Sequence, residues 1–142
     1  VLPGRPVMVL DVAHNPHAVA ALSENLDAMG FYPTTHAVFG AMADKDVAAI
    51  MARVGVLVDR WYFCDLPTAR ASSAQDLQKQ WQQTNSRKNV TSSVYKDPKA
   101  AFEAAVAAAD PADRIVVFGS FYTVGGVLKD GIPRLNAPHL SS

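Results

Sequence analysis

Hydrophobic residues along the chain fall into two alternating patterns. Short apolar runs of strand length recur, and between them apolar residues are spaced three or four positions apart, as on one face of a helix. Strands that alternate with helices are typical of a parallel sheet with helices on both faces. The chain is therefore predicted to be an α/β domain with a Rossmann-like, mostly parallel sheet. The predicted strands are Val7–Val12, His36–Gly40, Trp61–Cys64, Val90–Tyr95 and Arg114–Gly119.

Residues suited to helix ends predict where the helices begin and stop. Gly30 suits the C-terminal stop of the first helix, and Ser72 with Gln75 forms a capping-box pattern at the start of the third. The predicted starts are Asn15–Pro16, Asp44, Ser72 and Asp97–Pro98. The predicted inward-facing residues are Val19, Leu22, Leu26 and Met29, then Val47, Ile50, Met51 and Val54, then Leu77 and Trp81, and finally Phe102, Ala105, Val106 and Ala109.

The predicted elements indicate one domain. No linker or repeat interrupts the 142 residues, and the strand at Val90–Tyr95 is polar enough to be an edge strand. Residues 131–142 contain two prolines and no periodicity, so we expect an irregular tail. The chain begins with Val1 rather than methionine, and we expect it to be part of a longer protein.

Composition and charge argue against several classes of protein. Hydrophobic residues make up 49% of the chain, which argues against disorder, and thirteen basic residues balance thirteen acidic ones, which argues against binding to nucleic acids or membrane surfaces. No apolar stretch reaches the roughly 20 residues needed to cross a bilayer. The single cysteine, Cys64, cannot form an internal disulfide, and we expect a reducing, cytoplasmic location.

Asp11 follows the first apolar run and precedes a helix N-cap. Ligands of open α/β sheets lie beyond the carboxyl ends of the strands, where an acid can hold the ribose hydroxyls of a nucleotide. The alternative is that Asp11 only braces the turn through backbone N–H groups. On position alone we favour the functional interpretation, because charge at the end of a buried strand is costly unless a partner compensates it.

His14 lies in the same turn, one residue before the predicted N-cap. The positive end of the helix dipole favours anions there, and a neutral imidazole can donate a hydrogen bond to a phosphate or carboxylate oxygen. A lone histidine in a loop is more often simply solvated. Its position beside Asp11 favours a functional role.

A second junction of the same design lies at Gly119–Thr123, where an apolar strand ends in a glycine followed by Ser120, a good N-cap. If the two strands are parallel, both turns lie at one edge of the sheet and form one site, with Ser120 and Tyr122 as hydrogen-bonding groups. By spacing alone, a plain helix cap after a glycine turn is the better explanation. The sequence has no Walker A loop and no zinc-type spacing, so we predict no phosphate cradle or metal site within it.

Three motifs resemble those of folylpolyglutamate synthases and bifunctional dihydrofolate synthases, which are ligases of the Mur type. They are Leu10–Ala18 (LDVAHNPHA), Val38–Asp46 (VFGAMADKD) and Val117–Gly125 (VFGSFYTVG). Three motifs in the right order are far more specific than any one of them. The resemblance covers almost the whole chain and is to the C-terminal domain of these enzymes.

The resemblance implies an ATP-dependent, amide-forming ligase. ATP phosphorylates a carboxylate of dihydropteroate or of a folate, and the amine of L-glutamate then attacks the acyl phosphate. The Mg²⁺ ligands and a Gly-Lys-Ser phosphate loop are expected in the ligase's own N-terminal domain, so the C-terminal domain alone is expected to be inactive. By family likeness Asp11 contacts the ATP ribose and His14 lies near the phosphates as a catalytic residue. Ser120 and Tyr122 are expected to bind glutamate.

One segment departs from the family pattern. The family places an ATP-contacting arginine in a Leu-Pro-Gly-Arg segment further upstream of the aspartate, whereas Leu2–Arg5 ends only six residues before Asp11 and is followed by Pro6. We interpret Arg5 as a look-alike of the family arginine. Two alternatives stay open, namely a free-standing nucleotide-binding regulatory module and a Mur-type ligase domain that acts on another carboxylate.

Overall fold

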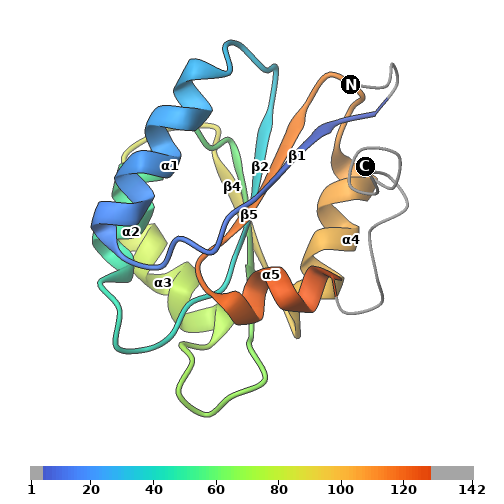
Figure 1. Cartoon of the computed structure of the whole chain (residues 1–142). Helices are drawn as coiled ribbons and strands as arrows, with labels where there is room; N and C mark the ends of the chain where they lie inside the picture. The colour runs from blue at the N-terminus through green and yellow to red at the C-terminus, as the bar shows by residue number, and fades with distance from the viewer. Residues whose placement is uncertain (1–4, 129–142) are drawn as a thin grey trace.

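The computed structural model describes residues 5–128, which form one parallel sheet between two layers of helices (Figure 1). The five strands lie in the order β1-β5-β2-β3-β4, each parallel to its neighbours. The predicted α/β class is confirmed, and the strand boundaries differ from the prediction by no more than two residues. The strands are β1 Val7–Leu10, β2 Thr35–Phe39, β3 Arg60–Cys64, β4 Thr91–Tyr95 and β5 Arg114–Phe118. The helices are α1 Pro16–Ala28, α2 Val47–Gly55, α3 Ala74–Thr84, α4 Pro98–Ala108 and α5 Phe121–Leu128.

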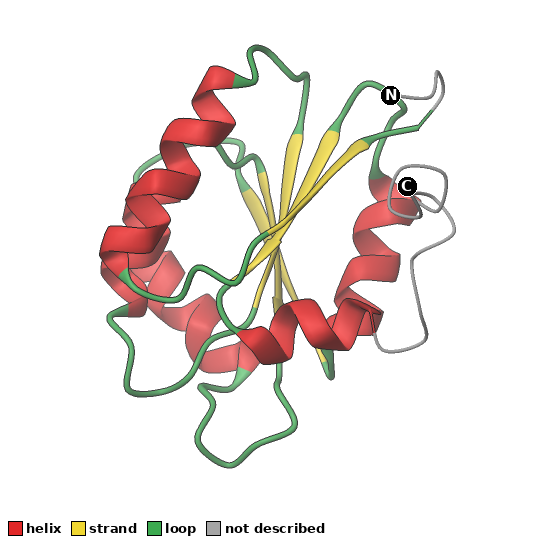
Figure 2. Ribbon diagram, in the orientation of Figure 1, coloured by secondary structure: helices red, strands yellow, loops and turns green. Residues whose placement is uncertain are grey.

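The two helical layers bury opposite faces of the sheet (Figure 2). On one face Leu22 of α1, Ile50 of α2 and Leu77 of α3 are buried in one cluster. The same cluster contains the stacked rings of Trp61 and Phe63, whose centroids are 5.4 Å apart. On the other face α4 and α5 pack against the alternate residues of the same strands. Because successive side chains of a strand point to opposite faces, one continuous apolar strand serves both layers.

The last strand in the sequence, β5, lies inside the sheet between β1 and β2. All five of its residues are buried, as are those of β2. The polar strand predicted for an edge is β4, and this position is confirmed. The other edge is β1, which pairs only with β5 among the described strands. The tail predicted at residues 131–142 lies outside the described residues.

The caps of α1 and α4 are confirmed. The side chain of Asn15 accepts a hydrogen bond from the N–H of Ala18, and that of Asp97 accepts one from the N–H of Ala100. The predicted stop at Gly30 has a φ of +94°, a conformation that glycine adopts without strain. The inward faces are confirmed apart from Met29, which caps the end of α1 and is 37% exposed.

The predicted starts of α2 and α3 were wrong by a few residues. The cap of α2 is Asp46 rather than Asp44, and its carboxylate accepts from the N–H of Ala49 at 3.1 Å. The cap of α3 is Ser73 rather than Ser72, and the capping box with Gln75 does not form at the predicted position.

A contact between two loops precedes both helices. The N–H of Ser72 donates to the carbonyl of Ala41 at 2.9 Å, and the N–H of Ala43 donates to the carbonyl of Arg70 at 2.8 Å. Residues 41–43 and 70–72 therefore form a short antiparallel bridge. Both helices begin after this bridge, with Asp46 and Ser73 as their caps.

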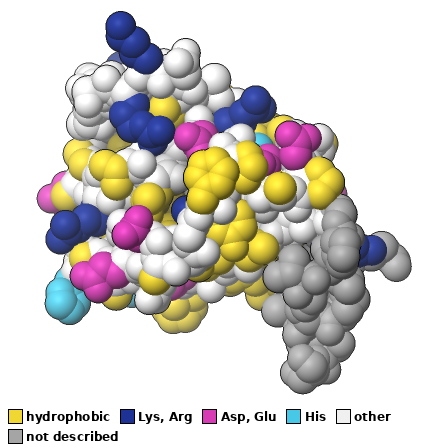
Figure 3. Space-filling model, turned by 90° about the horizontal axis from the view of Figure 1, so that it is seen from above, with side chains coloured by type: hydrophobic (Ala, Val, Ile, Leu, Met, Phe, Trp, Pro, Cys, Tyr) yellow, Lys and Arg dark blue, Asp and Glu magenta, His cyan; other side chains and the backbone are white. Residues whose placement is uncertain are grey.

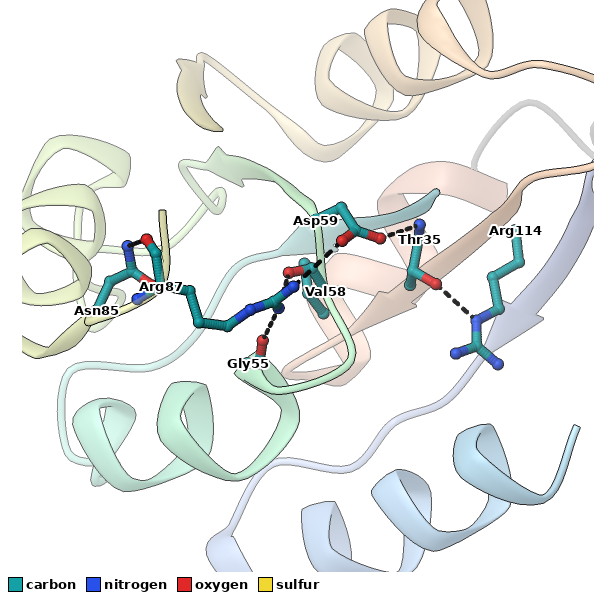
Figure 4. Close-up of polar contacts among 7 residues, drawn as sticks. All are labelled: Thr35, Gly55, Val58, Asp59, Asn85, Arg87 and Arg114. Atoms are coloured by element: carbon teal, nitrogen blue, oxygen red, sulfur yellow. Dashed lines mark hydrogen bonds and ion pairs between the residues drawn. The ribbon is translucent and has the colours of Figure 1, made fainter. Parts of the chain in front are cut away.

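A chain of polar contacts crosses the end of the sheet at which the strands begin (Figure 4). The buried guanidinium of Arg114 donates to the Thr35 hydroxyl at 2.8 Å and to the carbonyl of Leu26 at 2.6 Å. It also lies over the Tyr32 ring, 4.7 Å from the centroid. Burial lowers the pKa of Arg114 from its usual value, and the hydrogen bonds and the ring compensate the buried charge.

The outer part of the same chain is formed by Arg87. Its guanidinium donates to the carbonyls of Gly55 and Val58, both at 2.7 Å, and to the carboxylate of Asp59 at 3.3 Å. The other carboxylate oxygen of Asp59 accepts from the N–H of Thr35 at 2.9 Å. Arg87 thereby satisfies carbonyls at the C-terminal end of α2, where a helix leaves such acceptors without partners.

The surface at this end of the molecule has no dominant charge. Looking down on it, Figure 3 shows acidic, basic and hydrophobic side chains interspersed over the described residues. This distribution agrees with the formal net charge of zero. Among the described helices, none is long and apolar enough to cross a membrane.

Arg114→Met should lower the free energy of unfolding by about 3 kcal/mol, because two buried acceptors lose a charged donor. Arg87→Met is the matched control at the more exposed end of the same contacts and should cost about 1 kcal/mol. Urea unfolding of the chain at neutral pH measures both losses. Equal losses would show that burial does not decide how much these contacts stabilise the fold.

Candidate functional site

The two predicted turns lie side by side at the carboxyl edge of the sheet. The N–H of Gly119, after β5, donates to the carbonyl of Ala13, after β1, at 3.1 Å. The N–H of Asp11 donates to the carbonyl of Val117 at 2.9 Å. The prediction that Asp11–His14 and Gly119–Tyr122 share one edge is therefore confirmed, and the two turns are joined directly through their backbones.

The chain leaves these two turns in opposite directions. The turn after β1 leads into α1 on one face of the sheet, whereas the turn after β5 leads into α5 on the other (Figure 1). Open α/β sheets bind ligands where the segments that follow two neighbouring strands lead to opposite faces of the sheet. The fold thus places both candidate turns at the position where a ligand is expected.

Asp11 braces its own turn, as the alternative interpretation proposed. One carboxylate oxygen accepts from the N–H of Ala13 at 2.8 Å, and the residue is only partly buried. A carboxylate has two oxygens and about four acceptor positions, so this contact leaves capacity for the hydroxyls of a ligand. The bracing contact fixes the direction of the carboxylate, and the ATP contact stays a prediction.

The ring of His14 is oriented by the backbone of its own turn. Its Nδ1 lies 2.9 Å from the carbonyl oxygen of Val12. A carbonyl can only accept, so Nδ1 carries the proton of the neutral ring and Nε2 is left as an acceptor. The neutral imidazole therefore cannot donate from Nε2 to a phosphate, contrary to the expectation from the sequence. In this orientation it donates from Nε2 only when both nitrogens are protonated.

Ser120 caps α5, which confirms that part of its predicted role. Its hydroxyl oxygen accepts from the N–H of Thr123 at 3.1 Å, and the residue is 5% exposed. The next residues are open to solvent, with Phe121 70% and Tyr122 47% exposed. Of the two residues predicted to bind glutamate, Tyr122 is accessible to solvent, whereas Ser120 is buried and bonded to the N–H of Thr123. Both assignments stay predictions.

The sequence analysis did not predict the contact between Thr123 and Gly40 at this edge. The hydroxyl of Thr123 is buried and donates to the carbonyl of Gly40, after β2, at 2.7 Å. It also lies 3.1 Å from the hydroxyl of Ser120. The Ser-x-x-Thr spacing at a helix start resembles a capping pair and was a usable signal for Thr123. No local signal points to Gly40, because its partner is 83 residues away.

Close packing of two glycines holds the turns after β2 and β5 together. The φ of Gly119 is +117°, and a Cβ added to it would lie 2.2 Å from the carbonyl oxygen of Gly40 and 2.9 Å from the Phe39 ring. No side chain fits in this space. The glycine at position 119 thus permits the turn after β5 to approach the carbonyl of Gly40. A Cβ added to Gly40 would instead meet Leu66 and Cys64, so that glycine permits close packing against the end of β3.

The buried His36, Tyr62 and Asp113 lie away from this site. His36 contacts the hydroxyl of Tyr62 at 2.9 Å and the carboxylate of Asp113 at 3.0 Å, in the half of the sheet where the strands begin. Burial raises the pKa of Tyr62. Burial likewise raises the pKa of the Cys64 thiol, which keeps it protonated and unreactive. In residues 5–128 no group of three or more histidine, cysteine or acidic residues is arranged to hold a metal ion.

Comparison with known proteins agrees with this geometry. The profile of the family described as "Mur ligase, glutamate ligase domain" matches residues 1–121, which is most of the chain. The chain is a Mur ligase C-terminal domain. It is similar to the C-terminal region of the dihydrofolate synthase/folylpolyglutamate synthases of Escherichia coli K12 and of Buchnera aphidicola from Acyrthosiphon pisum. The former is 34% identical over 136 residues and the latter 31% over 135 residues.

Solved structures show the same relationship. A bifunctional folylpolyglutamate synthase/dihydrofolate synthase with Mn, AMPPNP and L-glutamate bound superposes with a TM-score of 0.78 at 34% identity, over 92% of this chain and 30% of that one. The Escherichia coli FolC complex with DHPP and ADP gives a TM-score of 0.76 at 32% identity, over 92% of this chain and 31% of that one.

The relatives are much longer proteins. The alignments with the two synthases cover 91% and 90% of this Mur ligase domain but only 30% and 31% of the synthases. The bound nucleotide, metal and glutamate belong to those complete enzymes. The comparisons therefore establish the family and the fold of this domain.

Gly119→Ala should destabilise the domain by about 3 kcal/mol, because the methyl group overlaps the carbonyl of Gly40 and an alanine is strained at this φ. Gly125→Ala is the control: a Cβ there meets nothing within 4 Å, and it lies in α5, where alanine is favoured over glycine by about 1 kcal/mol. Thermal and urea unfolding measure both. A Gly119→Ala protein as stable as the Gly125→Ala protein would contradict the close contact of the two turns.

Proposed function

We propose that this chain is the C-terminal domain of an ATP-dependent ligase that adds L-glutamate to dihydropteroate, to folylpolyglutamate, or to both, through an acyl phosphate. The observation that carries the proposal is the direct contact of the turns of the first and third motifs at the carboxyl edge, in a chain about a third identical to such synthases over most of its length. The fold likeness to a synthase with AMPPNP and L-glutamate bound supports it further.

The residues of this domain supply only part of such a site. The described residues contain no cluster suited to a metal ion, and the sequence contains no Walker A loop. We therefore assign Mg²⁺ and the cradle of the ATP phosphates to an N-terminal domain of the same ligase. Asp11 contributes the contact to the ribose hydroxyls, since its carboxylate is fixed by Ala13 and retains acceptor positions.

The orientation of His14 suits proton transfer from the attacking amine. When the amine of glutamate attacks the acyl phosphate, a C–N bond forms, the C–O bond to phosphate breaks, and the nitrogen loses a proton. A neutral imidazole with its proton on Nδ1 presents Nε2 as the acceptor for that proton. The resulting imidazolium is charged next to the departing phosphate, which favours it electrostatically.

Glutamate is proposed to lie against the turn after β5. Tyr122 presents an exposed phenol in the first turn of α5, and Ser120 lies beneath it at the cap. The N-terminal end of α5 adds a positive dipole that attracts carboxylates. These features fit an acidic amino acid more closely than a neutral one.

The direct test compares this chain alone with the chain joined to the N-terminal domain of its own gene. The joined protein should form ADP only when L-glutamate and dihydropteroate or a folate are both present. The chain alone should be inactive and bind ATP no more tightly than about 1 mM, since it lacks the phosphate loop and metal ligands. Coupled ADP assays and calorimetry measure these properties.

ADP formation with a different carboxylate would indicate another Mur-type ligase, and micromolar ATP binding by the chain alone would indicate a nucleotide-binding module.

Single substitutions in the joined protein separate the roles of the two turns. Asp11→Asn should raise KM for ATP, because an amide is a weaker acceptor for the ribose hydroxyls than a carboxylate. Tyr122→Phe should raise KM for glutamate, because it removes the phenol hydroxyl, and each effect should be roughly ten-fold. His14→Ala should lower kcat with both substrates saturating. Steady-state kinetics with ATP and glutamate varied separately measure the effects.

Thermal melting of the same variants is the control. If all of them lose activity toward both substrates equally and melt at lower temperature, the residues only shape the turns and the assignments are wrong.

A further inference from the structure

We propose that Thr123 is a positioning residue that fixes the hydroxyl of Ser120 and holds the turn after β5 against the turn after β2. This inference rests on the proposed function for its catalytic consequence. The contacts themselves are independent of that function.

Thr123 is completely buried, and both its backbone N–H and its hydroxyl form hydrogen bonds at the site. Its backbone N–H donates to the Ser120 hydroxyl oxygen at 3.1 Å, and its own hydroxyl donates to the carbonyl of Gly40 at 2.7 Å. The two hydroxyl oxygens lie 3.1 Å apart. One side chain therefore connects the third motif to the second.

The number of protons decides the direction of the Ser120 hydroxyl. A hydroxyl has a single proton, and the proton of Thr123 is used on Gly40, whose carbonyl can only accept. Ser120 must then be the donor in its contact with Thr123. With its oxygen also accepting from the N–H of Thr123, Ser120 has one lone pair left and no free proton. Thr123 thus sets both the position and the polarity of the cap residue.

A backbone hydrogen bond of Gly119 joins the remaining turn of the site. Gly119 donates its N–H to Ala13 in the turn that carries Asp11 and His14. The turn after β5 is therefore bonded to the turn after β1 through its backbone and to the turn after β2 through the hydroxyl of Thr123. Its loss leaves the buried carbonyl of Gly40 without this donor and frees the Ser120 hydroxyl to rotate.

The test uses the joined protein with three substitutions. Thr123→Val keeps the shape and removes the hydroxyl, Thr123→Ser restores it, and Thr35→Val is the matched control. Thr35 is also buried, and its hydroxyl accepts from Arg114 at 2.8 Å at the opposite end of the sheet. Both valine variants should melt at lower temperature. Only Thr123→Val should raise KM for glutamate by roughly ten-fold while KM for ATP changes by less than about two-fold, and Thr123→Ser should recover most of the loss.

Two outcomes overturn the inference. One is that Thr123→Val and Thr35→Val show the same ratio of KM for glutamate to KM for ATP. The other is that Thr123→Ser fails to restore this ratio to its value in the unsubstituted protein. If the unsubstituted joined protein forms no glutamate-dependent ADP, the proposed function fails. Amide hydrogen exchange then decides the inference: exchange at Gly119 and Thr123 must be faster in Thr123→Val than in Thr35→Val, and equal rates overturn it.

Discussion

The pairing of β5 between β1 and β2 is the contact on which the rest of the structure depends. It joins both neighbouring strands through backbone hydrogen bonds and buries every residue of β5 under helices on both faces. At its start Arg114 is bonded to the end of α1 and to Thr35. At its end Gly119 contacts both neighbouring turns. A single strand thus connects the polar contacts at one edge to the candidate site at the other.

The sequence predicted those parts of the fold that short-range chemistry decides. Asn15 and Asp97 precede proline and cap their helices as predicted, and the apolar spacing identified nearly all of the buried residues. It failed where two suitable caps stood close together, as at Asp44 and Asp46. The loop before this helix forms a bridge between residues 41–43 and 70–72, which lie far apart in the chain. Local propensity contains no information about such a bridge.

The position of the candidate site was predictable, but its internal bonding was not. Two strand-to-helix turns must share an edge if their strands are parallel, so the sequence alone predicts that the turns of Asp11 and Ser120 lie together. The orientation of His14 depends on one carbonyl, and the contacts of Ser120 depend on Thr123 and Gly40. Such bonds follow from the packing of distant segments.

The place of β5 in the sheet also constrains the order in which the chain can fold. The first described strand of the domain, β1, has β5 as its partner in the sheet, and their paired residues are more than a hundred positions apart. Strands β2, β3 and β4 can pair as soon as they emerge, because each neighbours the next. The turn containing Asp11 must wait for Gly119 before it gains its backbone partner. Pairing across such a separation is slow, so the candidate site is among the last parts of the domain to assemble.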